Sequence, residues 1–244
     1  MFSPTTRTTA LASLLLLPLA AACGESDAQS PEGQGMLNVF VYGEEFVEEG
    51  IPADAMSDGW AIDFEGFAVE VTSVTVGDAA FSDATTIQIA PPTEGEGHHL
   101  AELPLDAGTY ESVDYALGTI RVVGSAEKEG VTKTFDWTFE VPTTYAECHT
   151  TVTVEADQSS RLELTIHADH LFYDSLVSED PALVFALLAA ADGDDENDDI
   201  SREELEAASV GTLDVGNEEI ENLWEWLEAQ VATLGHIDGE GHCH

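Results

Sequence analysis

The sequence predicts a mainly β protein with some helix: an antiparallel β-sandwich of about eight strands, followed by a C-terminal helical segment of about three helices. Apolar and polar residues alternate in short runs as far as Asp174, and clusters of Gly, Pro, Asp and Ser separate these runs. From Ser178 onward the apolar residues recur at helical spacing instead. Hydrophobic residues make up 43% of the 244 residues, so the chain can bury a core despite a formal net charge of −43.

A short apolar stretch lies near the N-terminus, before the predicted fold begins. Arg7 precedes residues 11–22, which are too few to span a bilayer, so residues 1–22 are predicted to be a secretion signal. The end of this stretch, the following Cys23 and a polar tether over 23–35 resemble the lipobox and tether of bacterial lipoproteins. This resemblance implies that Cys23 is diacylated and that the lipid anchors the protein in the cell envelope. The expected location is the outer membrane, on either its periplasmic face or its outer surface. Cleavage at the same place by an ordinary signal peptidase, without lipid, is the alternative.

The strands of the predicted sandwich occupy residues 36–175. The clearest one covers 131–141, in which Phe135, Trp137 and Phe139 fall on one face while threonines and acidic residues fall on the other. Such a pattern is typical of a half-buried antiparallel strand. Similar runs occupy residues 37–42, 60–64, 67–76, 85–89, 113–123, 148–154 and 162–166.

Two further features of these strands favour a sandwich. Apolar residues change faces after Val71 and again near Gly118, which indicates bulges or bends at both places. The segment 104–110, Pro-Leu-Asp-Ala-Gly-Thr-Tyr, leads into a strand and resembles the turn and strand entry of transthyretin-like or immunoglobulin-like sandwiches in bacterial lipoproteins. That resemblance implies the same two-sheet fold.

Residues 176–244 are predicted to form the helical segment. The first helix is expected to begin at Ser178, which is followed by acidic residues and a proline in the first turn. Ser201 and Glu204 form a capping-box sequence at the start of the second helix, and the third is expected over 217–234. Since no long linker precedes these helices, we expect them to pack against the sandwich.

The cysteines give one expected crosslink. Lipidation would consume Cys23, which leaves Cys148 and Cys243 in an oxidising compartment. We therefore expect a disulfide between these two residues, which would tie the middle of the chain to its C-terminus. A chain-entropy model predicts that such a disulfide raises the free energy of unfolding by about 4 to 5 kcal/mol.

An unusually acidic segment lies between the first two expected helices. Six of the eight residues in 192–199 are acidic, and the segment resembles an EF-hand calcium loop, with Glu204 as the bidentate ligand on the exit helix. Asp198 stands where the family has a turn glycine, and one residue is inserted, so the resemblance implies weak binding, at about 0.1 to 1 mM. A solvated acidic connection is the alternative. The implied calcium ligands are Asp192, Asp194, Asp195, Asn197, Asp199 and Glu204.

The histidines offer a second possible metal site. The expected disulfide would bring His149 close to the C-terminal histidines, although on the opposite strand face from Cys148. Two further histidines stand three residues apart at the end of the run 162–166, a spacing that chelates when the backbone turns. Ordinary surface histidines are the alternative. The candidate copper or zinc ligands are His149, His167, His170, His242 and His244.

Charge and motifs exclude some functions. Six Lys and Arg residues against 49 Asp and Glu exclude nucleic acid as a partner. The chain has no Gly-x-Ser-x-Gly elbow, no His-Glu-x-x-His motif and no phosphate loop. We therefore predict a non-catalytic, membrane-anchored, calcium-binding envelope protein whose protein partner is not specified. A histidine-based copper or zinc carrier is the alternative, and a hydrolase using His167, Asp169 and Ser175 is the third interpretation.

Overall fold

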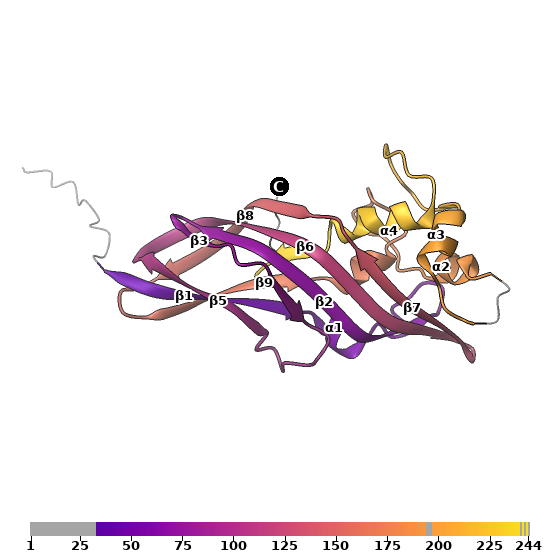
Figure 1. Cartoon of the computed structure of the whole chain (residues 1–244), viewed down its shortest axis with the longest axis horizontal. Helices are drawn as coiled ribbons and strands as arrows, with labels where there is room; N and C mark the ends of the chain where they lie inside the picture. Colours follow the sequence, from indigo (N-terminus) through magenta and orange to yellow (C-terminus); the bar gives the residue numbers. More distant parts are fainter. Residues whose placement is uncertain (1–32, 194–196, 240, 242, 244) are drawn as a thin grey trace, which may run out of the picture.

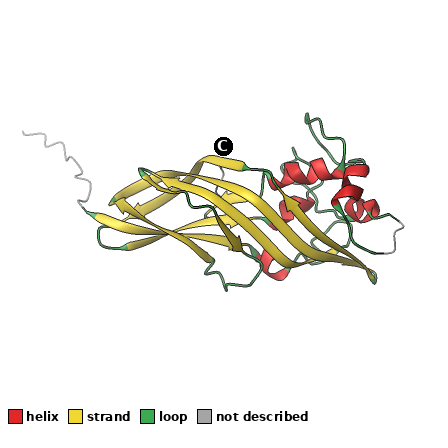
Figure 2. Cartoon of the chain, in the orientation of Figure 1, coloured by secondary structure: helices red, strands yellow, loops and turns green. Residues whose placement is uncertain are grey.

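The structure, a computed structural model, describes residues 33–193, 197–239, 241 and 243. It is elongated, with two sheets along most of its length and the C-terminal helices gathered at one end (Figures 1 and 2). The predicted signal, Cys23 and most of the tether lie outside the described residues. Among the residues that the structure describes, no helix is long and apolar enough to cross a membrane.

The smaller sheet has four strands, in the order β10, β9, β1, β5. β1 pairs antiparallel with β5 but parallel with β9, an exception in sheets whose other strand pairs are antiparallel, as predicted. The parallel pairing is possible because the whole larger sheet is inserted between β1 and β9 in the sequence. The strand bounds are β1 Gln34–Gly43, β5 His98–Asp106, β9 Ser159–Ile166 and β10 Gly235–Ile237.

The larger sheet has six strands built around β6, which pairs with β2 along one edge and with β7 and β8 along the other. The predicted runs 60–64 and 67–76 form the single strand β2, whose register shifts at Gly66. The bulges expected near Val71 and Gly118 are confirmed, and there the Glu70 carboxylate accepts the backbone N–H of Thr119 at 3.0 Å. The bounds are β2 Ala61–Val76, β3 Ala79–Phe81, β4 Thr85–Gln88, β6 Gly108–Lys128, β7 Val131–Phe139 and β8 Thr143–Val154.

The core lies between the sheets and confirms the predicted sandwich. Phe135, Trp137 and Phe139 are buried on the inner face of β7, as their alternation predicts. The sequence reasoning missed the strands β3, β5 and β10. β5 contains Pro104, which is tolerated because β5 is the edge strand of its sheet.

Three α-helices lie in the C-terminal segment, as predicted, and they pack on the sandwich. The indole N–H of Trp137 donates to the carbonyl of Ile200 at 2.8 Å, and Phe139 stacks on Trp224 with ring centroids 4.7 Å apart. The described chain also contains a short helix after β1 and a 3-10 helix after β9 that the sequence did not predict. The bounds are α1 Glu45–Glu49, η1 Ala168–Phe172, α2 Ala186–Ala191, α3 Arg202–Ala207 and α4 Leu223–Val231.

The expected start of the first of these helices is wrong. The helix α2 begins at Ala186 rather than at Ser178, because the carboxylate of Asp58 accepts the backbone N–H groups of Phe185 and Ala186 at 2.6 and 2.7 Å. Upstream, the backbone N–H of Ser178 donates to the hydroxyl of Ser175 instead of starting a helix.

The last predicted helix is also shorter than expected. The helix α4 starts after Asn222, whose side chain caps it by accepting the N–H of Glu225 at 2.9 Å. The chain then returns to the smaller sheet as β10, so the segment after residue 175 is not purely helical.

Candidate metal centre

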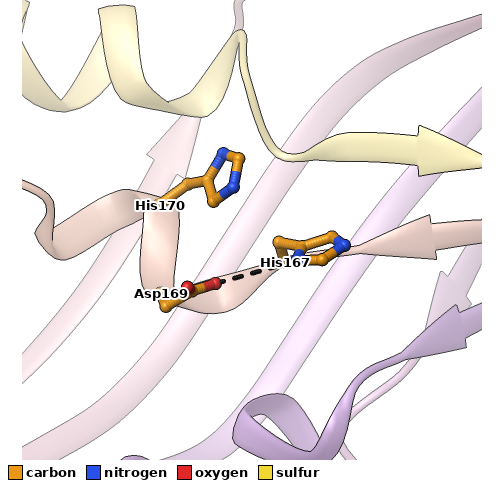
Figure 3. A group of neighbouring side chains, drawn as sticks. All are labelled: His167, Asp169 and His170. Atoms are coloured by element: carbon orange, nitrogen blue, oxygen red, sulfur yellow. Dashed lines mark ion pairs between the residues drawn. The ribbon is translucent and has the colours of Figure 1, made fainter. Parts of the chain in front are cut away.

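A cluster of metal-binding side chains lies where β9 ends and η1 begins. His167, Asp169 and His170 each offer one ligand atom, and these atoms lie within 4.8 Å of one another (Figure 3). His167 has only 5% of its surface exposed, whereas the other two residues are partly exposed. The turn into η1 brings the three side chains together, because a continued strand would spread them over both faces.

The imidazole of His167 has oxygen acceptors near both ring nitrogens. Nδ1 lies 3.1 Å from Oε2 of Glu44 and 4.0 Å from Oδ1 of Asp169, while Nε2 lies 3.4 Å from the carbonyl oxygen of Gly239. A neutral imidazole carries only one N–H. Donation to one side therefore leaves a nitrogen lone pair facing oxygen on the other side, unless a second proton or a metal ion lies there.

The other two members of the cluster are oriented by hydrogen bonds. The hydroxyl of Thr233 donates to the carbonyl of Gln230 at 2.8 Å, so it accepts from Nδ1 of His170 at 2.9 Å. This bond fixes the proton of His170 on Nδ1 and leaves the lone pair on Nε2. The hydroxyl of Tyr173 donates to Oδ2 of Asp169 at 2.8 Å, which leaves Oδ1 on the side of His167.

A third imidazole, that of His236, lies against the cluster from β10. Its ring centroid is 4.3 Å from that of His167 and 5.2 Å from that of His170. A surface pocket of about 320 Å³ is lined by His170, His236 and Cys243 among others. The cluster therefore opens toward solvent on its His170 side.

A pair of stacked tyrosines fastens β10 in place. The rings of Tyr115 and Tyr145 stack at 4.6 Å; the hydroxyl of Tyr115 donates to the carbonyl of His236, and that of Tyr145 accepts the N–H of Gly235. Burial raises the pKa of Tyr145 to about 12 and raises that of Tyr115 as well, so both hydroxyls keep their protons. The predicted disulfide between Cys148 and Cys243 is confirmed and secures the segment after β10.

The predicted set of five histidines is only partly brought together. His167 and His170 lie side by side, but His149 is exposed on β8 and lines a different pocket with Glu111 and Thr150. His149 does face away from the buried Cys148, as expected. The other two candidate ligands, His242 and His244, lie outside the described residues.

Sequence reasoning missed two neighbours of the cluster, Glu44 and His236. Glu44 lies beside His167 only because Gly43 and Ile166 are opposite each other in the parallel pairing of β1 and β9. His236 arrives through β10, a strand of three residues. The spacing His167-Ala-Asp-His170 was the one available signal for Asp169.

The acidic segment between α2 and α3 is engaged by a lysine of the sandwich. Lys133 bonds to Oδ2 of Asp192, whose side chain is 2% exposed, and lies 2.8 Å from Oδ1 of Asp198. Hydrogen bonds to these two carboxylates raise the pKa of Lys133. The ammonium group thus already supplies a positive charge to the loop.

Glu204, the expected bidentate calcium ligand, is also engaged. Its Oε1 accepts the N–H of Gly193 at 3.0 Å, and its Oε2 accepts the N–H and hydroxyl of Ser201 at 2.8 and 2.7 Å. The predicted capping box is confirmed. The backbone hydrogen bonds from Ser201 and Gly193 lower the pKa of the Glu204 carboxyl.

The remaining expected calcium ligands are only partly described. The side chain of Asn197 accepts the N–H of Asp199 at 2.8 Å, and Oδ1 of Asp199 accepts the hydroxyl of Thr134 at 3.1 Å. Asp194 and Asp195 lie outside the described residues. Asn197 and Asp199 therefore make contacts within the loop and with β7.

Ser175, named in the hydrolase interpretation, belongs to a local loop. Its hydroxyl donates to Asp214 at 3.2 Å and accepts the N–H groups of Val177 and Ser178. These bonds stabilise the turn that precedes α2.

No family model, no curated protein and no solved structure matches the chain. The function is therefore inferred from the geometry of its own residues.

Proposed function

We propose that this chain is a lipid-anchored protein of the cell envelope that binds a divalent transition metal ion, zinc or copper, without catalysing a reaction. The ligands are Nδ1 of His167, Oδ1 of Asp169 and Nε2 of His170. The observation that carries the proposal is the convergence of these side chains within 4.8 Å, combined with hydrogen bonds that occupy their outward-facing atoms. Such outer hydrogen bonds are typical of metal-binding histidines and carboxylates.

The donor atoms favour a transition metal over calcium at this cluster. Imidazole nitrogens suit zinc and copper, whereas calcium and magnesium prefer oxygen ligands. Ligand atoms bind zinc at about 2.0 to 2.2 Å. His167 Nδ1 and Asp169 Oδ1, 4.0 Å apart, can therefore reach a common ion after a small contraction.

Calcium binding by the acidic loop is a second candidate function. It is favoured by the position of Glu204, whose carboxylate lies at the other end of the loop within 3.0 Å of the N–H of Gly193, although calcium would have to replace that hydrogen bond. Any calcium ion there competes with the Lys133 ammonium for Asp192 and Asp198. We therefore expect binding no tighter than about 0.1 to 1 mM, in the range of extracellular modules.

The cell-envelope location rests on the N-terminal sequence and on the disulfide. A disulfide is expected in secreted proteins and is rare in reducing compartments. The net charge of −43 also raises the local concentration of cations around the protein. Mass spectrometry of the native protein tests the anchor, because an unmodified N-terminus at Cys23 or cleavage elsewhere contradicts it.

A chelator-competition titration with zinc and copper tests the metal site. We expect one tightly bound ion per chain, and His170→Ala should weaken its binding about 100-fold or more because it removes a ligand. His149→Ala is the matched control, since His149 lies in another pocket. Equal losses in both variants, or no effect of either, would contradict the site.

A further inference from the structure

We infer that Glu44 is the fourth ligand of this ion and that it closes the coordination sphere. This inference rests on the proposed function of the cluster. Oε2 of Glu44 already lies 3.1 Å from Nδ1 of His167, the atom assigned to the metal. Two donors bound to one tetrahedral zinc ion are about 3.3 Å apart, so these two atoms, now at hydrogen-bond distance, can bind the same ion without moving far.

One tautomer of His167 fits the same assignment. The carbonyl of Gly239 next to Nε2 and the Glu44 carboxylate next to Nδ1 can both only accept, so a neutral imidazole satisfies one of them, and metal binding through Nδ1 requires the proton on Nε2. Nδ1 then presents a lone pair to the Glu44 carboxylate, and two lone pairs at this distance repel each other. A cation bound by both atoms removes the repulsion.

Charge distinguishes Glu44 from His236 as the fourth ligand. With Asp169 alone the site would hold a divalent ion at a net charge of +1, next to the buried ring of His167. A second carboxylate makes the site neutral, which lowers the cost of placing the ion in a poorly solvated position. Glu44 is not among the residues whose ligand atoms already lie within 4.8 Å of one another, so its side chain, which is 31% exposed, has to turn toward the ion.

A coordination sphere of two imidazoles and two carboxylates determines which metal ion the site prefers and whether the ion can bind water. Four protein ligands are typical of zinc sites that hold the ion, whereas catalytic zinc sites keep one position for water. Nitrogen and oxygen donors without thiolate or thioether also favour zinc(II) over copper(I). Glu44 therefore commits the site to holding a divalent ion rather than activating water.

Cobalt(II) as a spectroscopic probe, together with zinc affinity, tests the role of Glu44. The parent should show the intense visible bands of four-coordinate cobalt, and added azide should leave them unchanged because no position is open. In Glu44→Gln we expect zinc binding to weaken about 10- to 100-fold and azide to shift the cobalt spectrum. Glu45→Gln is the matched control, since Glu45 is the exposed neighbour.

The outcomes separate this inference from the function on which it rests. Absence of tight cobalt and zinc binding by the parent removes the metal site itself. If the parent binds tightly but its cobalt spectrum changes with azide, the metal site stands and Glu44 is not its fourth ligand. The same conclusion follows if Glu44→Gln behaves like the parent. The same holds if His236→Asn opens the sphere to azide and Glu44→Gln does not. Melting curves of the metal-free variants confirm that each one is folded.

Discussion

The acidic loop and the turn after β9 hold cation-binding side chains in opposite ways. The loop is far richer in carboxylates, with six acidic residues among the eight in 192–199. Yet Asp192 and Glu204 are occupied by a lysine and by N–H and hydroxyl donors of the chain itself. In the turn, the outer atoms of His170 and Asp169 form hydrogen bonds with Thr233 and Tyr173, and one potential ligand atom of each residue lies within 4.8 Å of the others.

This difference shows that the density of potential ligands in a sequence is a poor guide to a metal site. Carboxylates in a row repel one another and recruit whatever donors the fold supplies, here Lys133. A site instead needs ligand atoms fixed in position by outer partners before the ion arrives. The following predictions test whether the two regions really differ in this way.

Removal of the disulfide should have the largest effect. The double variant Cys148→Ala and Cys243→Ala opens a loop of 95 residues, which lowers the free energy of unfolding by about 4 kcal/mol. Because Cys243 follows the segment that carries His236 and Gly239, zinc affinity should fall as well, while the response to calcium should not change. Urea denaturation and metal titration measure both effects. A calcium response that falls with the zinc affinity would contradict the separation of the two regions.

Lys133→Met should give the next largest effect, confined to the acidic loop. It leaves the nearly buried carboxylate of Asp192 without its counter-ion, which costs about 3 kcal/mol. Calcium should then stabilise the variant more than the parent, as judged by the shift in melting temperature, since the ion can replace the ammonium. Arg121→Met, which breaks the exposed pair with Asp136, should change the free energy of unfolding much less, because solvent screens that pair. If calcium stabilises Lys133→Met no more than the parent, the loop is only a solvated connection.

Thr233→Val should weaken zinc binding about 10-fold, although Thr233 is not a ligand of the ion. The hydroxyl is the acceptor that fixes the proton of His170 on Nδ1, and its loss frees the ring to adopt the wrong tautomer. Thr143→Val is the control, because Thr143 lines the same pocket but donates to the carbonyl of Val141. Equal zinc affinities of the Thr233 variant and the parent would show that this hydrogen bond does not organise the site.

Glu204→Gln should have the smallest effect and should change the pH dependence of stability. Hydrogen bonds from the backbone N–H groups of Ser201 and Gly193 hold the pKa of the Glu204 carboxyl in the folded protein below its ordinary value. Its stabilisation is therefore present above about pH 4.5 and is lost as the pH falls through the folded-state pKa. Glutamine can keep the capping box but has one carbonyl oxygen for the N–H groups of both Gly193 and Ser201, so the variant should lose about 1 kcal/mol at neutral pH and should show a flatter acid limb in thermal melts.

Calcium titrations on this variant also test the EF-hand interpretation. Calcium should raise the melting temperature of the parent but not that of Glu204→Gln, whereas the surface change Glu129→Gln should leave the increase intact. Identical calcium responses in both variants would mean that the stabilisation is diffuse screening of the acidic surface.

Local patterns made much of the fold predictable. Alternation around Phe135, the capping box at Ser201 and the slip after Val71 all depend on neighbours in the sequence, and the structure confirms each one. The start of α2 was not predictable, because its cap, Asp58, lies 127 residues away from Phe185 in the sequence.

The candidate site was less predictable than the fold, for the same reason. His167, Asp169 and His170 are close in sequence, and their spacing indicated a chelate. Glu44 reaches them through a parallel strand pairing and His236 through a short strand, and neither pairing leaves a local signal. Lys133 belongs to the alternating pattern of β7, which gave no indication that it reaches the acidic loop.

X-ray absorption spectroscopy of the zinc-loaded protein tests the central claim most directly, since it reports which atoms surround the ion. One equivalent of zinc should have only nitrogen and oxygen neighbours at about 2.0 to 2.2 Å, with the outer-shell scattering of two imidazoles. The His149→Ala variant should give the same spectrum, and His170→Ala should lose one imidazole. A spectrum with oxygen neighbours alone, unchanged by His170→Ala, would place the ion on the acidic surface and contradict the site.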